Sequence, residues 1–290
     1  MDGIVVKSLG GFYYVKTGNG IIYPTRARGL FRKQHISPVV GDKVIISHLE
    51  DETASLDTIC ERKNFIERPP VANVDKLFIV VSGIDPKPNL LLIDKSIAVA
   101  DSNGIEPVLL LSKSDLSDLS DIQTIYERIG IKCITTSKYS EQWIPILENE
   151  IKGYISVFTG NSGVGKSTIM NKLKPSLNLN TGETSRKLGR GRHTTRHVEL
   201  FEIDEESFII DTPGFSTFEL ERYNFSDKET VISGFREFSD YICECMFTSC
   251  SHTCEKGCAV IKAVNDGIIP ETRHRNYITM YNEVKDINKW

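Results

Sequence analysis

The residues with the clearest chemical role form one glycine-rich run, Gly160-Asn161-Ser162-Gly163-Val164-Gly165-Lys166-Ser167. This run has the G-x-x-x-x-G-K-[ST] spacing of a phosphate-binding loop. The glycines let successive backbone N–H groups turn inward around phosphate oxygens, and the helix that follows adds its positive N-terminal dipole. In such a loop Lys166 reaches the β- and γ-phosphates and the Ser167 hydroxyl binds Mg²⁺. The sequence therefore predicts a nucleoside triphosphate site.

A second motif, Asp211-Thr212-Pro213-Gly214, follows the strand candidate Ser207–Ile210. We expect a strand that delivers Asp211 at its C-terminal end, where open α/β sheets bind ligands. Asp211 would hold the Mg²⁺ shell through water, and the Gly214 N–H would sense the γ-phosphate. An isolated Asp-x-x-Gly is more often a plain turn, but at this distance after a phosphate loop it indicates the metal side of the same site.

The residues that would recognise the base precede the loop, in Ser112-Lys113-Ser114-Asp115. An aspartate here accepts hydrogen bonds from N1 and the 2-amino group of guanine, which adenine does not offer, so Asp115 favours GTP over ATP. The stem of Lys113 can lie along the base. Asn or Thr is usual where this chain has Ser112, whose hydroxyl would serve more weakly. Residues 135–138, including Ser137, can close over the base through backbone N–H groups.

A basic segment, residues 183–196, lies between the loop and Asp211 and carries five Lys/Arg against one Glu. We expect it to be mobile without ligand and to become ordered when Thr194 or Thr195 binds Mg²⁺ and the γ-phosphate. Of the two we favour Thr195. The arginines of the segment can contact RNA phosphates, supply a cation at the transition state, or remain solvated.

Phe215 stands directly after the Asp-x-x-Gly motif, where many GTPases carry a glutamine that orients the attacking water. Phenylalanine cannot orient water, so another group must, and His193 in the basic segment is the candidate. A simple contact of His193 with phosphate or RNA is the alternative. Without a positioned water and an added cation hydrolysis should be slow, so the sequence implies an activating partner.

Five of the seven cysteines fall between residues 243 and 258. Within this stretch, three thiolates and one imidazole form a closed tetrahedral set suited to structural Zn²⁺: Cys245, Cys250, His252 and Cys258. Cys243 and Cys254 are left over, so a set of four cysteines is the alternative. Because no coordination position stays open, we expect the metal to support folding, by on the order of 10 kcal/mol, and not to catalyse.

The elements around these groups predict a multidomain α/β protein. Residues 1–66 have short β-like runs broken by glycine turns and no helix-length apolar stripe, which indicates a β-barrel of about five strands. Residues 67–222 alternate unbroken apolar runs with helical stretches, as in a parallel sheet covered on both faces. Residues 223–290 are predicted to be a helical domain around the cysteine cluster. The expected helices cover residues 89–102, 121–129, 140–151, 227–238, 258–266 and 270–287.

The composition sets limits on partners and location. The chain of 290 residues has 40% hydrophobic and 26% charged residues, and its net charge of −4 argues against a wholly basic nucleic-acid coat. Arg26, Arg28, Arg32 and Lys33 still concentrate positive charge in one barrel segment, which either contacts RNA or is a solvated loop. No apolar run approaches the ~20 residues of a membrane span, and the first residues do not resemble a signal peptide. We expect a cytoplasmic protein without membrane association.

The base motif, the phosphate loop, Thr-Thr and Asp-Thr-Pro-Gly follow one another in the order of a circularly permuted GTPase. With the barrel and the Cys-x4-Cys-x-His-x5-Cys site, the chain closely resembles the bacterial ribosome small subunit-dependent GTPase A family over essentially all its length. Residues 62–69, 71–75 and 191–195 are also similar to that family. Ser112 is the departure from the family pattern, and it affects the strength of base binding more than its specificity.

The resemblance implies an oligonucleotide/oligosaccharide-binding (OB) barrel, a GTPase stimulated by the small (30S) ribosomal subunit, and a role in late maturation of that subunit through GTP-dependent binding to 16S rRNA and release. It also implies that His193 is catalytic, together with Lys166 and Thr195, and that the four residues named above bind zinc. We expect a monomer that binds GTP and GDP.

Two alternatives stay open. One is a GTP-gated RNA-binding switch whose hydrolysis is incidental, and the other is an ATPase with another nucleic-acid substrate, against which Asp115 argues. The residues expected to bind Mg²⁺ are Ser167, Thr195 and Asp211. The residues expected to contact the nucleotide are Ser112, Lys113, Asp115, Ser137, Gly160, Asn161, Ser162, Gly163, Val164, Gly165, Lys166, Ser167, Thr168, Asp211 and Gly214.

Overall fold

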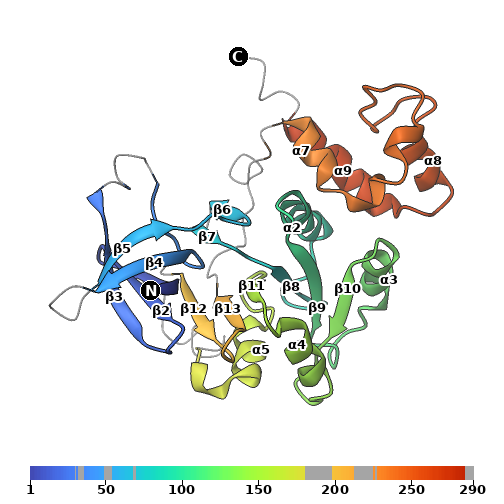
Figure 1. Ribbon diagram of the computed structural model, residues 1–290. Helices are drawn as coiled ribbons and strands as arrows, with labels where there is room; N and C mark the ends of the chain where they lie inside the picture. The colour runs from blue at the N-terminus through green and yellow to red at the C-terminus, as the bar shows by residue number, and fades with distance from the viewer. Residues whose placement is uncertain are drawn as a thin grey trace. The chain divides into compact units, whose positions relative to one another are not determined.

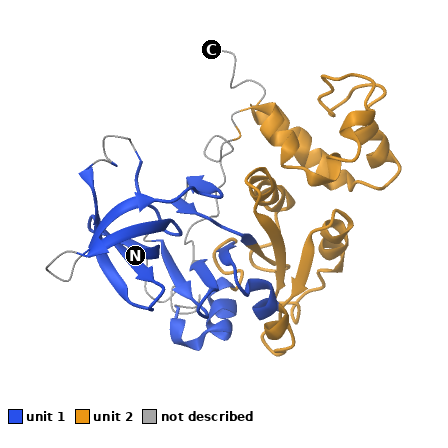
Figure 2. Ribbon diagram, in the orientation of Figure 1, with its two compact units in different colours: residues 1–77, 147–159, 166–215 blue, residues 78–146, 160–165, 216–290 orange. Residues whose placement is uncertain are grey.

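The computed structural model describes residues 1–29, 31, 36–48, 54–67, 70–179, 198–211, 225 and 227–284. The chain divides into two compact units, which Figure 2 distinguishes by colour. Unit 1 comprises residues 1–77, 147–159 and 166–215, and unit 2 comprises residues 78–146, 160–165 and 216–290. Among the described helices, none is long and apolar enough to cross a membrane.

An N-terminal barrel opens unit 1 (Figure 1). In the described residues it has five strands: β1 (Asp2–Leu9), β2 (Phe12–Thr17), β3 (Ile22–Ala27), β4 (Lys43–His48) and β5 (Ala54–Ile59). They pair in the order β1-β2-β3-β5-β4, and β4 pairs back onto β1 to close the barrel. Alternate residues point inward, so that Val5, Val15, Val44 and Leu56 share one buried core. The predicted five-stranded barrel is confirmed.

The barrel is not a separate sheet in unit 1. Strand β1 also pairs with β12 (Glu199–Glu202), which pairs with β13 (Phe208–Asp211), which in turn pairs with β11 (Ile155–Thr159). Strands β11 and β13 are parallel, but β12 is antiparallel to both of its neighbours. Residues 203–207 between β12 and β13 are too few for the crossover that a parallel pair needs. The expected parallel sheet thus contains an antiparallel strand, and the sequence did not predict its union with the barrel.

The segment that leaves the barrel is held by side chains. It forms a small hairpin of β6 (Phe65–Glu67) and β7 (Pro70–Ala72). The Arg62 guanidinium contacts Asp42 through Nε and Nη2 at 2.7 and 2.9 Å, and the Asp42 side chain is fully buried. Asn73, in the left-handed region at φ 59°, donates from Nδ2 to the Gly41 carbonyl at 2.9 Å. These contacts make the linker a fixed part of the barrel.

Strands and helices alternate in the first part of unit 2. Strand β8 (Lys76–Ser82) enters from unit 1, and the order of strands is β10-β9-β8, with β9 (Glu106–Ser112) parallel to β10 (Lys132–Thr135). The chain between and after them forms α2 (Leu90–Ser102), α3 (Ser120–Arg128) and α4 (Trp143–Ile151). Strand β11 then leads to α5 (Lys166–Leu173) and the 3₁₀ turn η1 (Pro175–Leu177) of unit 1. The α/β pattern predicted for this region is confirmed.

The C-terminal part is helical, as predicted. It contains α7 (Lys228–Ser233), η3 (Arg236–Phe238), η4 (Ile242–Glu244), α8 (Ala259–Asn265) and α9 (Glu271–Val284). The expected single helix over residues 227–238 is interrupted at Gly234. A Cβ atom on Gly234 would lie 2.7 Å from the Cβ of Ala98 in α2, so only glycine allows this close approach.

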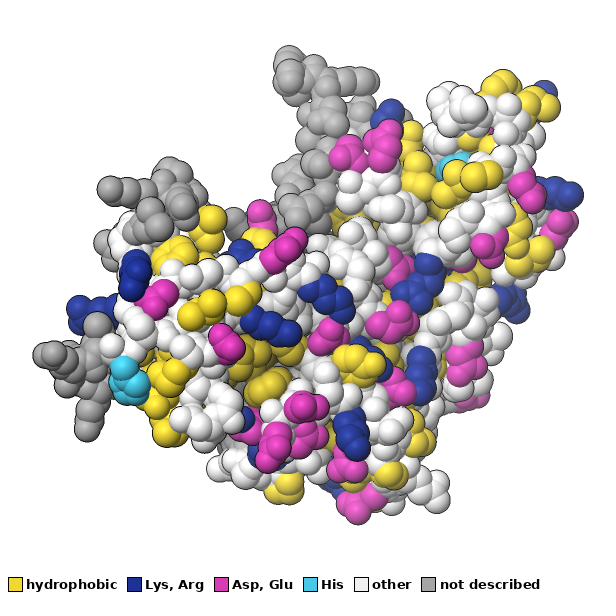
Figure 3. Space-filling model, in the orientation of Figure 1, with side chains coloured by type: hydrophobic (Ala, Val, Ile, Leu, Met, Phe, Trp, Pro, Cys, Tyr) yellow, Lys and Arg dark blue, Asp and Glu magenta, His cyan; other side chains and the backbone are white. Residues whose placement is uncertain are grey.

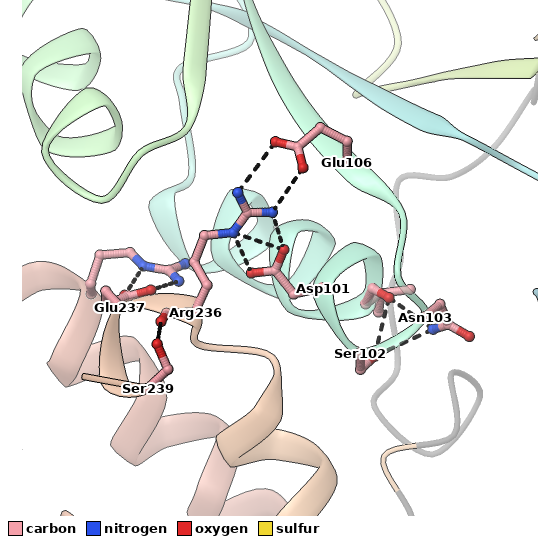
Figure 4. Close-up of polar contacts among 9 residues, drawn as sticks. Asp101, Ser102, Asn103, Glu106, Arg236, Glu237 and Ser239 are labelled. Carbon is pink, nitrogen blue, oxygen red and sulfur yellow. Dashed lines mark hydrogen bonds and ion pairs between the residues drawn. The ribbon is translucent and has the colours of Figure 1, made fainter. Parts of the chain in front are cut away.

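Ion pairs attach these C-terminal elements to α2 within unit 2 (Figure 4). Arg236 Nε lies 3.0 Å from Asp101 Oδ1, and Arg236 Nη1 lies 3.2 Å from Glu106 Oε1. Arg273 of α9 is fully buried and contacts Asp94 of α2 at 2.9 Å and Glu237 of η3 at 2.8 Å. Buried charges are tolerated only when they are paired, so this network defines how α9 and η3 sit on α2.

Candidate functional site

The phosphate-loop sequence adopts a backbone that requires glycine. Gly160, Gly163 and Gly165 have φ angles of 144°, 87° and 107°, in the region that L side chains rarely adopt. A Cβ atom on Gly160 would lie 2.4 Å from the Val80 carbonyl oxygen, which leaves no room for a side chain. The loop follows β11 directly, and Lys166 begins α5, so the structure places the loop in the strand-to-helix position that phosphate binding needs.

Ser112 connects the end of β9 to this loop. Its side chain is buried, and Oγ lies 2.5 Å from the Val164 carbonyl oxygen and 3.0 Å from the Val81 carbonyl oxygen. A hydroxyl has one proton, so it can donate to one of these carbonyls at a time. We expected Ser112 to act at the base, but its hydroxyl is directed at the loop backbone. Its effect on a bound nucleotide would therefore be indirect, through the position of the loop.

The base motif and the segment around Ser137 lie together in unit 2. The Ser114 N–H donates to the Thr136 carbonyl at 3.2 Å, and the Lys138 N–H donates to Asp115 Oδ1 at 3.4 Å. Partial desolvation acts to raise the pKa of Asp115, but hydrogen bonds from its own N–H, the Ser137 hydroxyl and the Lys138 N–H hold that pKa below its usual value. Asp115 is thus an exposed, ionised acceptor, as hydrogen bonding to two guanine donors requires.

Three supporting residues around the base motif, Asp85, Pro86 and Trp143, were not identified from the sequence. Lys113, at φ 57°, donates from Nζ to the Asp85 carbonyl at 2.9 Å. Pro86 lies beside the phosphate loop, with its Cδ 3.9 Å from the position of a Gly163 Cβ. Trp143 donates from Nε1 to the Ser137 carbonyl at 3.1 Å. Their contacts depend on loops that are distant in the chain, and the sequence carries no local signal for them.

Asp211 is the last residue of β13, as the sequence predicted for the strand. Its Cα partners are Phe158 on β11, next to the start of the phosphate loop, and Glu199 on β12. The side chain of Asp211 lies outside the described part of the chain. So do several residues singled out in the sequence: Arg32, Lys33, His193, Thr194, Thr195, Gly214 and Phe215.

The four predicted zinc ligands come together between η4 and α8. The ligand atoms of Cys245, Cys250, His252 and Cys258 all lie within 4.8 Å of one another. His252 Nδ1 lies 3.5 Å from both Cys245 Sγ and Cys258 Sγ, and the two sulfurs are 3.8 Å apart. Metal–ligand bonds of about 2.3 Å to sulfur and about 2.0–2.1 Å to nitrogen give tetrahedral edges of about 3.8 and 3.6 Å. The cluster therefore fits a tetrahedral metal ion.

Groups around the cluster orient its ligands. Ala259 N–H donates to Cys245 Sγ at 3.4 Å and Ile261 N–H donates to Cys258 Sγ at 3.5 Å, which supports negative charge on the sulfurs. Burial lowers the pKa of His252, which keeps its imidazole neutral and able to ligate. Burial raises the pKa of the Cys250 thiol to about 12, so its ionisation requires a cation. The spare thiols of Cys243 and Cys254 are exposed.

Comparison with known proteins covers nearly the whole chain. The family model for the RsgA GTPase matches residues 59–221, and the model for the RsgA N-terminal domain matches residues 2–56. A protein of Caldanaerobacter subterraneus subsp. tengcongensis named small ribosomal subunit biogenesis GTPase RsgA is 42% identical, over 100% of this chain and 97% of its own. A protein of the same name from Geobacillus sp. (strain WCH70) is 40% identical, over 98% of each chain.

Two solved structures are similar over almost the full length. The crystal structure of YloQ, described as a circularly permuted GTPase, has a TM-score of 0.79 at 32% identity and covers 98% of this chain and 95% of its own. The crystal structure of YjeQ from Thermotoga maritima has a TM-score of 0.82 at 32% identity and covers 98% of each chain. The fold, its permutation and the barrel are therefore shared with solved proteins.

Proposed function

The chain belongs to the RsgA GTPase family, whose members hydrolyse GTP, and on that premise we propose that it is a GTP hydrolase of small ribosomal subunit biogenesis. Its turnover would be stimulated by the small subunit. The GTP-bound protein would bind rRNA late in maturation of the subunit and dissociate after GTP hydrolysis. The observation that carries the proposal is the assembly of the glycine-only loop, Ser112 and Asp115 in unit 2.

The base side of this site supports selection of guanine. Asp115 would accept from N1 and the 2-amino group, with Lys113 along the base and Ser137 beside it. The Lys113 ammonium already contacts the Asp85 carbonyl, so its stem is held in place before a nucleotide binds. With adenine, the Asp115 carboxylate would lose two donors as the base covers it, which costs about 1–3 kcal/mol.

On the phosphate side, the backbone N–H groups of residues 160–165 would surround the phosphates, and Lys166 would neutralise them; Thr168 adds a hydroxyl in the first turn of α5. Ser167, Asp211 and Thr195 would hold Mg²⁺, with Thr194 as the alternative to Thr195. The ion would neutralise charge on the β- and γ-phosphates. The N–H of Gly214 would sense the γ-phosphate.

Because Phe215 occupies the position of the usual water-orienting glutamine, we assign that role to His193. The His193→Ala variant should lose stimulated turnover while nucleotide affinity is retained. Retention of full stimulated turnover would leave His193 with a contact role only.

Three further assignments complete the proposal. The metal of the cysteine cluster would be Zn²⁺, because three thiolates and one imidazole form a closed site for it. The barrel would be an OB domain that contacts 16S rRNA, with Arg26 and Arg28 on or next to β3. The protein would be a cytoplasmic monomer, divided into domains at residues 1–66, 67–222 and 223–290.

The decisive experiment measures GTP turnover with and without purified small ribosomal subunits. We expect slow turnover alone and strong stimulation by subunits. An unchanged rate would reject the stimulated enzyme and favour the alternative, an RNA-binding switch with incidental hydrolysis. If subunits bind equally in the presence of GDP and of a GTP analogue, that alternative fails as well.

A second experiment tests the base assignment. Asp115→Asn replaces an acceptor by an amide that also donates, so affinity for GTP should fall while discrimination against ATP weakens. Affinities for GTP and ATP are measured for the wild type and the variant under the same conditions. Equal affinity of the wild type for the two nucleotides would contradict the guanine assignment.

A further inference from the structure

The barrel and the predicted magnesium aspartate are joined by one row of paired residues. Lys7 on β1 is the Cα partner of Glu199 on β12, Glu199 is the partner of Asp211 on β13, and Asp211 is the partner of Phe158 on β11. At the usual spacing of about 4.8 Å between strands, β1 lies only about 10 Å from β13. The row thus connects the barrel, which is proposed to bind RNA, to the end of β13, the strand that carries Asp211.

A bulge in β1 makes this connection possible. The register between β1 and β2 shifts between Val5, which faces Val15, and Lys7, which faces Tyr14. In a regular strand without a bulge, Lys7 would point to the same side as Val5, into the barrel core. The bulge reverses that alternation and places Lys7 outside, where Nζ contacts Glu199 Oε2 at 2.9 Å.

A second lysine of the barrel secures the other end of the β12–β13 hairpin. Lys16 on β2 forms an ion pair with Glu202, and its ammonium lies 5.6 Å from the centre of the Phe208 ring. Glu202 and Phe208 are Cα partners at the turn end of the hairpin. In the described residues, β1 and β12 are registered at the single pair Lys7 and Glu199, so side-chain contacts contribute much of what holds the barrel to this hairpin.

We propose that Lys7 and Glu199 are positioning residues, which couple the barrel to the magnesium side of the nucleotide site through β12 and β13. The proposal rests on the proposed function for the roles of the barrel and of Asp211. When the barrel binds its RNA partner, a shift of β1 moves Glu199 and, with it, the end of β13.

Charge reversal tests the coupling. The variants are Lys7→Glu, Glu199→Lys and the double variant that restores the pair in reverse. Lys43→Glu makes the same change of charge at an exposed position on β4 of the barrel, which does not pair with β12, and serves as the control. Two quantities are measured: the Mg²⁺ concentration for half-maximal binding of a non-hydrolysable GTP analogue, and the ratio of subunit-stimulated to unstimulated kcat.

We expect each single reversal to raise that Mg²⁺ concentration and to lower the stimulation ratio by about fivefold or more, the usual lower range of coupling between two sites. The double variant should return both to within about twofold of the wild type. The direction of the change in this Mg²⁺ concentration distinguishes positioning from a direct electrostatic effect of the new charge on Mg²⁺. An added negative charge at residue 7 would strengthen Mg²⁺ binding through the field, whereas positioning weakens it in both single variants.

The coupling is overturned by single reversals without effect, by shifts of opposite sign in the two single variants, or by a double variant as impaired as the singles. An equal effect of Lys43→Glu does so too. Circular dichroism checks folding, and Lys7→Met with Glu199→Gln replaces any reversal variant that does not fold. If subunits fail to stimulate GTP turnover by the wild type, the proposed function is rejected. The Mg²⁺ measurement still decides whether the row of residues couples the barrel to the nucleotide site.

Discussion

At the scale of single residues, Ser112 directs its side chain to the backbone of the phosphate loop. Its hydroxyl is buried between the Val81 and Val164 carbonyls, and it joins the end of β9, which precedes Asp115 in the chain, to the phosphate loop. A side chain with two N–H donors could satisfy both carbonyls, but serine satisfies one at a time. The departure from the family pattern at this position therefore concerns hydrogen bonding to the loop backbone.

Removing this hydroxyl should weaken nucleotide binding. Ser112→Ala leaves a buried carbonyl without its donor, which costs about 1–3 kcal/mol, and about 1.4 kcal/mol corresponds to a tenfold change in affinity. We expect GTP and GDP to bind about tenfold more weakly, measured by titration calorimetry. Ser96→Ala, which removes a buried hydroxyl bonded to the Leu92 carbonyl in α2, is the control and should leave affinity unchanged. Equal losses in both variants would indicate general destabilisation.

At the scale of elements, the segment after the barrel is a structural part and not a flexible tether. Asn64 both donates to the Val74 carbonyl and accepts from the Val74 N–H, at 2.7 and 2.9 Å. The Asp75 carboxylate accepts from the Ile155 N–H at 2.9 Å, and so fastens the same segment to β11. The barrel is therefore connected to β11, the strand before the phosphate loop, in two ways: through this segment, and through the paired strands β12 and β13.

The ion pair between Arg62 and Asp42 should be critical for this arrangement. Arg62→Met leaves the fully buried Asp42 carboxylate without its bidentate partner, and breaking a buried pair in this way costs about 3–5 kcal/mol. The free energy of unfolding is measured by urea titration. Lys63→Met removes a more exposed pair with Asp75 and should cost no more than about 1 kcal/mol. Similar losses in the two variants would argue against a special role for Arg62.

At the scale of the whole molecule, the chain has no overall positive charge. On the face drawn in Figure 3, basic and acidic side chains are interspersed, in keeping with the net charge of −4. Contact with rRNA would therefore rely on particular segments and not on a general positive field. The C-terminal elements surround a residue cluster that fits a metal ion, and ion pairs connect them to α2.

Removal of the metal should unfold the cluster region. A chelator, or Cys258→Ser, should abolish metal binding and lose on the order of 10 kcal/mol of metal-linked folding energy. Metal content is measured by mass spectrometry and helical order by circular dichroism. Cys243→Ser and Cys254→Ser should keep the metal, because neither thiol belongs to the assembled set. Loss of metal in either variant would support the set of four cysteines instead.

Attachment of the C-terminal helices can be tested separately from their folding. Arg236→Met removes the contacts with Asp101 and Glu106 that Figure 4 shows, and leaves the nearly buried Asp101 carboxylate unpaired. We expect faster hydrogen exchange in α2 and η3, with metal content unchanged. Arg275→Met, which breaks an exposed pair with Glu271 on α9, should leave exchange as in the wild type. Loss of the metal in Arg236→Met would contradict this separation of roles.

The sequence by itself determined what depends on short spacings: the glycine-only loop before α5, the strand that ends at Asp211, the barrel, and a cysteine and histidine cluster within residues 243–258. These follow from steric limits and ligand geometry that a few neighbouring residues satisfy. Only the tertiary structure decided that Ser112 turns to the loop, that Gly234 meets Ala98, and that a bulge directs Lys7 to Glu199. Such contacts join residues up to 192 positions apart, and they depend on which strand edges and helix faces remain free after local structure has formed.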